Sequence, residues 1–141
     1  MLFTRETDYA IRFFRTLRDG QQHSVSNITE KELIPQQFAY KILRKLSKAE
    51  LVEVTRGAKG GCRLKADLSK VTLFDLIEIV ETKKTFVACL DPEFVCPYRE
   101  KNNGCAVHSN LDIIESQLAA QLKLVSLKDI LEEGFADRIT K

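Results

Sequence analysis

Hydrophobic and polar positions recur at helical spacing in the first third of the chain. In residues 7–17, apolar side chains repeat every three or four positions and arginines occupy the opposite face, which predicts an amphipathic helix. Ser24 is suited to cap a short second helix, because its hydroxyl can accept from a free amide of the first turn. Pro35 suits the first position of a third helix, since its fixed φ is already helical. The pattern therefore predicts three successive helices joined by short turns.

The third predicted helix, residues 35–49, has one apolar stripe and one polar face. Phe38, Ile42 and Leu46 recur at i, i+4 and i+8. The opposite face carries amide, aromatic and basic side chains without a carboxylate: Gln36, Gln37, Tyr40, Lys41, Arg44, Lys45 and Lys48. A helix face that meets only water usually mixes both charge signs, so this face is predicted to bind a polyanion.

A short β-hairpin is predicted after the basic helix. Residues 51–54 alternate like a strand, and residues 62–64 can pair with them. The glycine-rich connection between them carries Arg56 and Lys59. Helix, turn, basic helix and basic hairpin in this order predict a winged helix-turn-helix, whose second helix enters a major groove of double-stranded DNA. The narrow hairpin tip can place Arg56 against a phosphate or in the adjacent minor groove.

The second half of the chain contains two predicted helix starts and one long helix. Thr72 and Ser126 each precede an aspartate by three positions, which resembles a capping box. Between them lie a loop, residues 82–108, and a long helix, residues 110–125. The apolar positions of that helix extend beyond a single stripe, with Leu111, Ile114 and Leu118 on one side and Ile113 outside it. A second subunit is expected to cover this excess, which predicts a homodimer.

These elements predict a mainly α fold with a small β wing, a winged helix-turn-helix followed by a long dimerisation helix. We divide the chain into three parts. Residues 1–81 form the DNA-binding domain, residues 82–108 form a cysteine-bearing sensor loop, and residues 109–141 form the dimerisation helix and a C-terminal helix.

The charge distribution supports the DNA-binding prediction better than the total charge does. The chain of 141 residues has a net charge of only +2, but residues 36–65 carry +6 and the remainder carries −4. A basic block in an otherwise acidic chain is typical of a protein that binds a polyanion. No apolar run is long enough to span a bilayer, and charges interrupt the N-terminus, so no signal peptide or membrane association is expected. We therefore expect a cytoplasmic protein, in which four reduced cysteines favour metal or redox chemistry over disulfides.

Three of the cysteines lie in the predicted loop and are followed closely by a histidine. Cys89, Cys96, Cys105 and His108 have the pattern C-x6-C-x8-C-x2-H. Thiolates are the soft ligands that zinc and iron–sulfur clusters prefer. Structural zinc sites commonly use tight C-x2-C pairs, so the wide spacing suits a larger cluster better, without excluding zinc. The alternative is three cysteines in a loop that holds no metal. Cys62, alone on a wing strand, is expected only to pack.

Several segments together resemble a known family, the winged-helix regulators that include IscR, NsrR, RirA and CymR. The resemblance covers nearly the whole chain. Its strongest pieces are Thr7-Asp8-Tyr9-Ala10, Leu43-Arg44-Lys45-Leu46, Leu51-Val52 with Arg56-Gly57, Gly60-Gly61 and Leu64, Val71-Thr72-Leu73, the three-cysteine loop and Val125-Ser126-Leu127. The chain departs from the family at Cys62, where tyrosine is usual, at Glu50, where glycine is frequent, and in its longer intercysteine spacings.

The resemblance implies a homodimer joined by the long helices, with each cysteine loop near the partner's N-terminal domain. Family members with three cysteines usually hold a [2Fe–2S] or [4Fe–4S] cluster, and their operator affinity changes with redox state, nitric oxide or cluster supply. In one branch the fourth ligand is a histidine at the place that His108 occupies. In another branch it is an aspartate of the first helix, which corresponds to Asp8 of the partner subunit.

Three other interpretations compete with that of a cluster-controlled repressor. A regulator of the same fold could hold a structural zinc ion or bind a small effector. A thiol enzyme is poorly supported, because the chain has no C-x-x-C motif and Cys105 with His108 is weak evidence for a catalytic pair, so we expect no enzyme. A helix-turn-helix that binds only protein would not need a basic face of one sign.

Overall fold

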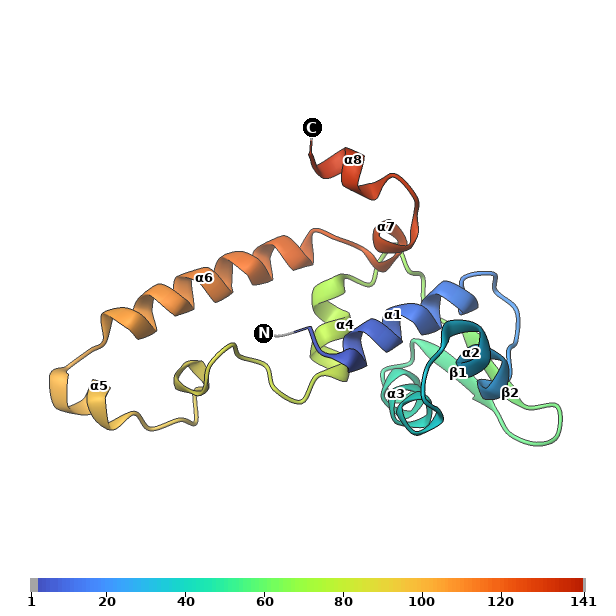
Figure 1. Ribbon diagram of the computed structural model, residues 1–141, viewed down its shortest axis with the longest axis horizontal. Helices are drawn as coiled ribbons and strands as arrows, with labels where there is room; N and C mark the ends of the chain where they lie inside the picture. Colours follow the sequence, from blue (N-terminus) through green and yellow to red (C-terminus); the bar gives the residue numbers. More distant parts are fainter. Residues whose placement is uncertain (1–2, 141) are drawn as a thin grey trace.

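The computed structural model describes residues 3–140, without the side chain of residue 139. Residues 1–2 and 141, the outer ends of the first and last predicted parts, lie outside the described residues. The elements, in chain order, are α1 (Arg5–Leu17), α2 (Val25–Glu32), α3 (Gln36–Lys48), β1 (Val52–Thr55), β2 (Gly61–Leu64), α4 (Leu73–Val80), the 3-10 helix η1 (Ala88–Leu90), α5 (Pro97–Asn102), α6 (Ala106–Lys123), α7 (Leu127–Leu131) and α8 (Phe135–Ile139) (Figure 1). The predicted mainly helical fold with a two-stranded wing is confirmed.

The core of the DNA-binding unit forms where α1 packs on α3 and α4. Phe13 and Phe14 of α1 are fully buried, together with Ile42 and Leu46 of α3. Burial of each such side chain contributes about 1.5–3 kcal/mol to the stability of the unit. The predicted stripe of α3 is shifted slightly, because Phe38 is only partly buried.

The turn between α2 and α3 is short and conformationally defined. Leu33 ends α2 in the left-handed region, at φ 54°, and its backbone amide donates to Thr29. Pro35 is the residue before α3, one position earlier than predicted, and no side chain caps that helix. The N-terminal turn of α3 therefore keeps its free backbone amides available to an external acceptor.

The wing is an antiparallel pair of strands extended by one bridge. Val52 lies opposite Leu64, and Thr55 lies opposite Gly61. His23 and Cys62 exchange two backbone hydrogen bonds, of 2.8 and 2.9 Å. A Cβ atom on Gly61 would lie 2.4 Å from the carbonyl oxygen of His23, so only glycine allows this approach. The wing is thus fixed to the start of α2.

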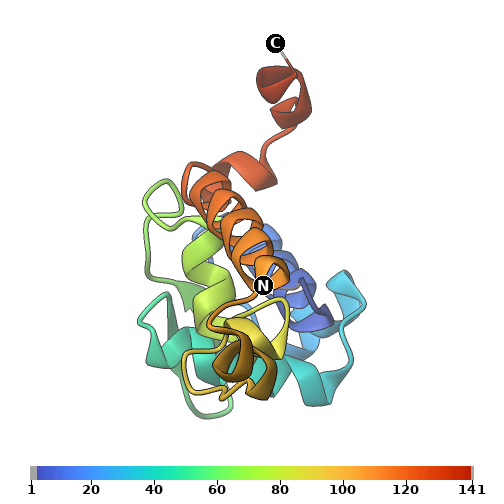
Figure 2. The same ribbon diagram turned by 90° about the vertical axis from the view of Figure 1, so that its left-hand side faces the viewer.

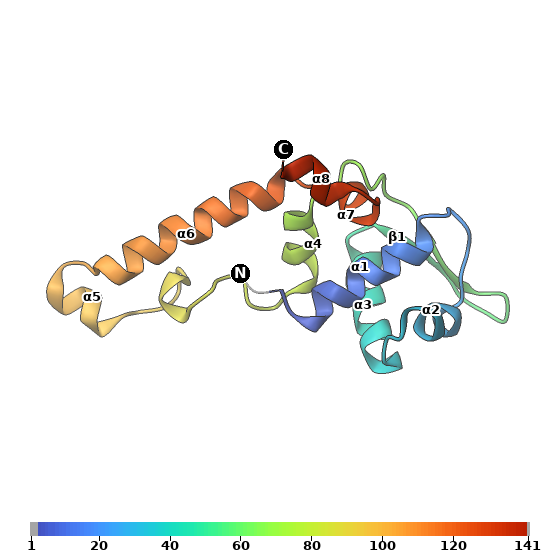
Figure 3. The same ribbon diagram turned by 45° about the horizontal axis from the view of Figure 1, so that its top comes forward.

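The second half of the chain forms an arm that extends from the DNA-binding unit. Residues 82–105 lead away from α4, and α6 returns beside them (Figures 1 and 3). The 3-10 helix η1 contacts α6, and the Phe86 amide donates to Glu115 at 2.8 Å. Seen along the arm, α6 lies next to α4 (Figure 2). None of the described helices combines the length and apolar character needed to cross a bilayer.

Both predicted capping boxes are present, but the start of the long helix was predicted wrongly. Thr72 with Asp75 and Ser126 with Asp129 each form the reciprocal pair of hydrogen bonds. The long helix begins at Ala106 rather than at residue 110, because the sulfur of Cys105 accepts from the His108 amide and caps the first turn. The expected loop, residues 82–108, also contains η1 and α5 and is therefore partly helical.

Glu32 is a buried carboxylate that joins the end of α2 to α1. It is 3% exposed; it accepts from Thr16 Oγ1 at 2.6 Å and from Arg15 Nε at 2.9 Å. Burial raises the pKa of Glu32, but the hydrogen bonds from Arg15 and Thr16 outweigh burial and hold the pKa below its ordinary 4.5. The ionised carboxylate therefore stabilises the fold above pH 4.5, and this contribution is lost as the pH falls through the folded pKa.

We expect Glu32→Gln to lower the free energy of unfolding at neutral pH by about 1–2 kcal/mol. As the pH falls from 4.5 through the folded pKa of Glu32, the variant should approach the parent, because the parent's carboxyl then becomes protonated as well. Urea unfolding at several pH values measures both effects. Glu30→Gln, at an exposed position of the same helix, is the matched control. An equal loss of stability by Glu32→Gln at all pH values would contradict the assignment.

Candidate nucleic-acid interface and cysteine segment

A groove of about 590 Å³ separates the exposed face of α3 from the first wing strand. Arg44 and Lys48 line it from the helix, and Arg56 lines it from the wing. Tyr40, predicted on the same face, also lines the groove and is 52% exposed. The arrangement offers a recognition helix and a wing that can contact one DNA duplex together.

The basic side chains of residues 36–65 fall into two sets, those that form an ion pair with a carboxylate and those that do not. Four of them form ion pairs with carboxylates: Lys41 and Lys45 with Glu6, Arg63 with Glu53, and Lys65 with Glu50. Within residues 3–140, Arg44, Lys48, Arg56 and Lys59 have no ion pair, and all four are exposed. Unpaired cations are the ones that can exchange solvent counterions for phosphates without losing an existing partner.

Glu6 gives the face of α3 a carboxylate that the α3 sequence itself does not contain. Lys45 Nζ lies 2.6 Å from Glu6 Oε2 and also donates to the carbonyl of Val80, and Lys41 donates to Glu6 Oε1. Burial raises the pKa of Glu6, but the two lysines outweigh burial and hold the pKa below its ordinary value. The side chain of Lys45 is only 25% exposed. Lys45 thus lies at the junction of α1, α3 and α4, at the margin of the groove face.

The remaining predicted DNA contacts are accessible. Gln36 and Gln37 are exposed in the first turn of α3. Lys59 is exposed at the wing tip, where its carbonyl accepts from Gln22 at 2.7 Å. Sequence reasoning missed Leu43, Ser47 and Val54, which also line the groove. Ser47 follows Arg44 by three positions, and this helical spacing could have indicated it.

The cysteine segment, residues 82–105, presents three half-buried free thiols at three separate positions. Cys89 lies in η1, Cys96 precedes α5, and Cys105 precedes α6. Within the described residues, no three His, Cys, Asp or Glu side chains are close enough to hold a metal ion. The donor types suit a metal or an iron–sulfur cluster, but their arrangement in this single chain does not form a site for either.

The two predicted fourth ligands lie in different surroundings. His108 lies in the first turn of α6, not in a loop, and the guanidinium of Arg99 lies 3.1 and 3.2 Å from its ring nitrogens. Asp8 is exposed on α1 and forms an ion pair of 2.8 Å with Arg12. Cys62 is fully buried, and burial raises the pKa of its thiol to about 11. Cys62 therefore packs, as predicted, and stays protonated.

The long helix α6 carries an uncharged face that the rest of the described chain leaves exposed. Val107, Ile113, Ile114 and Leu124 are each more than half exposed. Its seam positions alternate in steps of three and four: Val107, Asn110, Ile114, Gln117, Gln121 and Leu124. This spacing is typical of a helix that pairs with another helix.

Comparison with known proteins identifies the chain. A family model, Rrf2, described as an iron-dependent transcriptional regulator, matches residues 3–133. The chain belongs to the Rrf2 family. It is therefore a DNA-binding transcription regulator and not an enzyme, and the DNA-binding half of the predicted function is confirmed.

Two curated relatives show how far the similarity of this Rrf2 protein extends. It is 34% identical over 100 residues to protein aau3 of Rhizobium meliloti (strain 1021), a match that covers 69% of the chain and 65% of aau3. It is 27% identical over 133 residues to a protein of Aquifex aeolicus (strain VF5) described as an HTH-type transcriptional regulator. This match covers 93% of the chain and 92% of the Aquifex protein.

Two solved structures share the Rrf2 fold over most of the chain. CymR, the global cysteine regulator of B. subtilis, matches with a TM-score of 0.66 at 19% identity, covering 93% of this chain and 96% of CymR. IscR of T. potens matches with a TM-score of 0.67 at 19% identity, covering 93% of this chain and 86% of IscR. Identities this low establish the fold alone.

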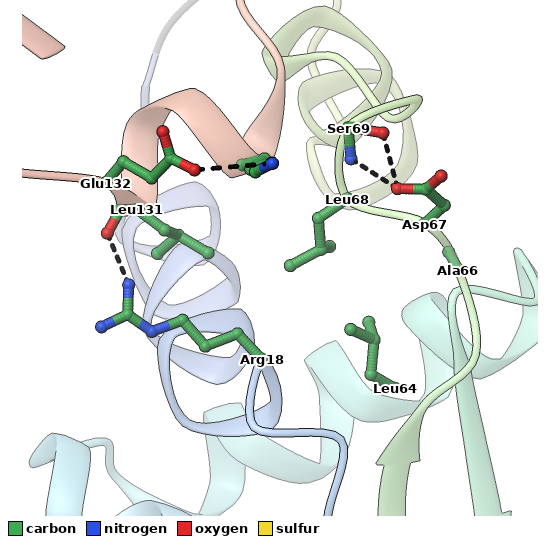
Figure 4. Close-up of a pocket in the computed structure, with 9 residues that line it drawn as sticks. Arg18, Leu64, Ala66, Asp67, Leu68, Ser69, Leu131 and Glu132 are labelled. Atoms are coloured by element: carbon green, nitrogen blue, oxygen red, sulfur yellow. Dashed lines mark hydrogen bonds and ion pairs between the residues drawn. The ribbon is translucent and has the colours of Figure 1, made fainter.

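The Rrf2 chain also has a hollow at the base of its wing. It measures about 360 Å³ and lies between the end of β2, residues 66–69 and α7. Leu64, Leu68 and Leu131 point toward it, and Arg18 at its edge donates to the carbonyl of Leu131 at 2.6 Å (Figure 4). The hollow lies between the wing and α7, and none of the three half-buried cysteines lines it.

Proposed function

We propose that this regulator binds its operator as a homodimer and that an iron–sulfur cluster held by Cys89, Cys96 and Cys105 controls its affinity. The observation that carries the proposal is the presence of three free, accessible thiols on the one segment that connects the DNA-binding unit to α6. In the reducing compartment that we expect for this protein, such thiols are available as ligands. Because they are not gathered in the single chain, the proposal requires residues 82–105 to rearrange around the cluster.

The dimer is proposed from the uncharged face of α6. Four large apolar side chains remain exposed there within the described chain. A second copy, packed helix to helix, would cover them and would place two recognition helices on one duplex. His108 is the proposed fourth ligand, and Asp8 of the partner subunit is the alternative.

The direct test is purification under anaerobic conditions, followed by visible absorption and analysis of iron and sulfide. We expect a coloured protein that loses colour in Cys89→Ser, Cys96→Ser and Cys105→Ser. Cys62→Ala is the matched control and should retain the cluster, because Cys62 is fully buried in the wing. A colourless parent with stoichiometric zinc would disprove the iron–sulfur proposal.

The fourth ligand is tested in the same preparation. We expect His108→Ala to lose iron and sulfide and Asp8→Ala to keep them. The reverse result would assign the ligand to Asp8 of the partner subunit. Retention in both variants would show that neither residue is the ligand.

A second candidate function is regulation by a small effector bound in the hollow at the wing base. The three leucines that face the hollow would suit an apolar ligand, and the site adjoins β2 directly. Screening small apolar acids and amines for a rise in melting temperature of the parent and of Leu68→Trp, which fills the hollow, tests this candidate. A ligand that stabilises only the parent would support it.

A further inference from the structure

The residue immediately before the cysteine segment is a buried carboxylate. Glu81 is the C-cap of α4, directly after the last helical residue, and is 7% exposed. Its Oε1 accepts from the Thr4 amide at 3.2 Å, from Thr4 Oγ1 at 2.7 Å, and from the hydroxyl of Thr7. Thr4 is the N-cap of α1. Glu81 thus fixes the C-terminal end of α4 to the N-terminal end of α1.

A second connection lies next to the first and reaches the recognition helix. Lys45 of α3 donates to the carbonyl of Val80, the last residue of α4, and to Glu6 in the first turn of α1. The N-terminal end of α1, the C-terminal end of α4 and the last turn of α3 therefore meet within one set of hydrogen bonds. Thr82, the first residue of the cysteine segment, borders the same junction.

The hydrogen bonds to the Glu81 carboxylate restrict how α4 and α1 can move relative to each other. Within residues 3–140 the buried carboxylate of Glu81 accepts from Thr4 and Thr7 and forms no ion pair. A buried carboxylate that loses its donors is costly, and all three donors, the Thr4 amide and the hydroxyls of Thr4 and Thr7, reach the same oxygen, Oε1. A shift of Thr82 that moved Glu81 would have to move α1 with it, because separation would leave the charge unsatisfied. The Lys45 bonds extend that constraint to α3.

We propose that Glu81 is a positioning residue that couples the cysteine segment to the recognition helix. The proposal rests on the proposed function, in which residues 82–105 sense the signal, but it concerns the mechanical link and not the identity of the sensed group. Coupling between two sites is reciprocal. DNA bound at α3 must therefore alter the stability of the segment just beyond Glu81, whether or not a cluster is present.

Amide hydrogen exchange of the metal-free, full-length protein tests the link. The probe is a duplex selected from a random-sequence library for binding to the parent. We expect the duplex to slow exchange in α3 and, by about 5-fold or more, in residues 82–90 of the parent. In Glu81→Ala, exchange in α3 should still slow, but the change in residues 82–90 should fall below about 2-fold.

Two further variants distinguish a loss of coupling from a nonspecific effect of substitution. Glu81→Gln keeps an acceptor where three donors converge, so it should retain the parent's response. Glu133→Ala removes an exposed carboxylate outside the junction and outside residues 82–90, and it should also respond like the parent. An unchanged response in a folded Glu81→Ala, or no response of residues 82–90 in the parent, would overturn the link. A colourless protein in the cluster test, with the exchange result as expected, would reject the proposed cluster and leave the link standing.

Discussion

A glutamate in place of Ile114 is expected to convert the protein to monomers and to lower its affinity for a two-half-site operator at least about 100-fold. Ile114 lies on the seam of α6 and is 53% exposed in the single chain. In a helix pair, the new carboxylate would lose its water without gaining a partner, a cost of several kcal/mol in each copy. Without the dimer, the two half-sites bind independently and the gain from linked binding is lost.

Sedimentation or light scattering measures the oligomeric state, and fluorescence anisotropy measures operator affinity. Ser116→Glu is the matched control, since Ser116 is exposed on the same helix but lies outside the alternating seam. The control should remain dimeric and bind the operator like the parent. A dimeric Ile114→Glu variant with parental affinity would mean that another surface joins the subunits.

The second large effect is expected at Arg44, an unpaired cation that lines the groove between α3 and the wing. Arg44→Ala in both copies should weaken operator binding by about 30-fold or more, because one base or phosphate contact by arginine contributes about 1–3 kcal/mol. Each lost phosphate contact should also reduce the slope of log affinity against log salt by about one. Binding measured at several salt concentrations gives both quantities.

Lys45→Met provides the informative comparison, because Lys45 belongs to the same predicted face. Its ammonium already binds Glu6 and the carbonyl of Val80. We expect this variant to change the salt slope less than Arg44→Ala and to lower the free energy of unfolding more. Arg138→Ala, on the C-terminal α8, should change neither the operator affinity nor the salt slope. Equal salt slopes in Arg44→Ala and the parent would place the DNA on another surface.

Local sequence signals determined most of the secondary structure because their physical causes are local. The capping boxes at Thr72 and Ser126 close within one helical turn, and both formed as predicted. The wing followed from alternation and glycine content. The start of α6 was missed because a cysteine supplied its N-cap, and cysteine is seldom counted among capping residues.

The sequence predicted the residues of the DNA-binding face but not which of its lysines are paired, because the pairing partner lies on another helix. The sequence of α3 contains no acidic residue, so all its lysines seemed equally available. Glu6, thirty-nine positions before Lys45, pairs with two of them once α1 packs on α3. A carboxylate supplied by another helix leaves no trace in the periodicity of the helix that it contacts.

The sequence by itself determined the winged helix-turn-helix, the position of the basic block and the thiol content of the connecting segment, since these follow from residue type and spacing along the chain. Only the tertiary structure decided which cations remain unpaired, that the three thiols lie on separate elements, and that Glu81 joins α4 to α1. Those properties depend on contacts between residues far apart in the chain, such as Thr4 and Glu81, which come together only when the helices pack.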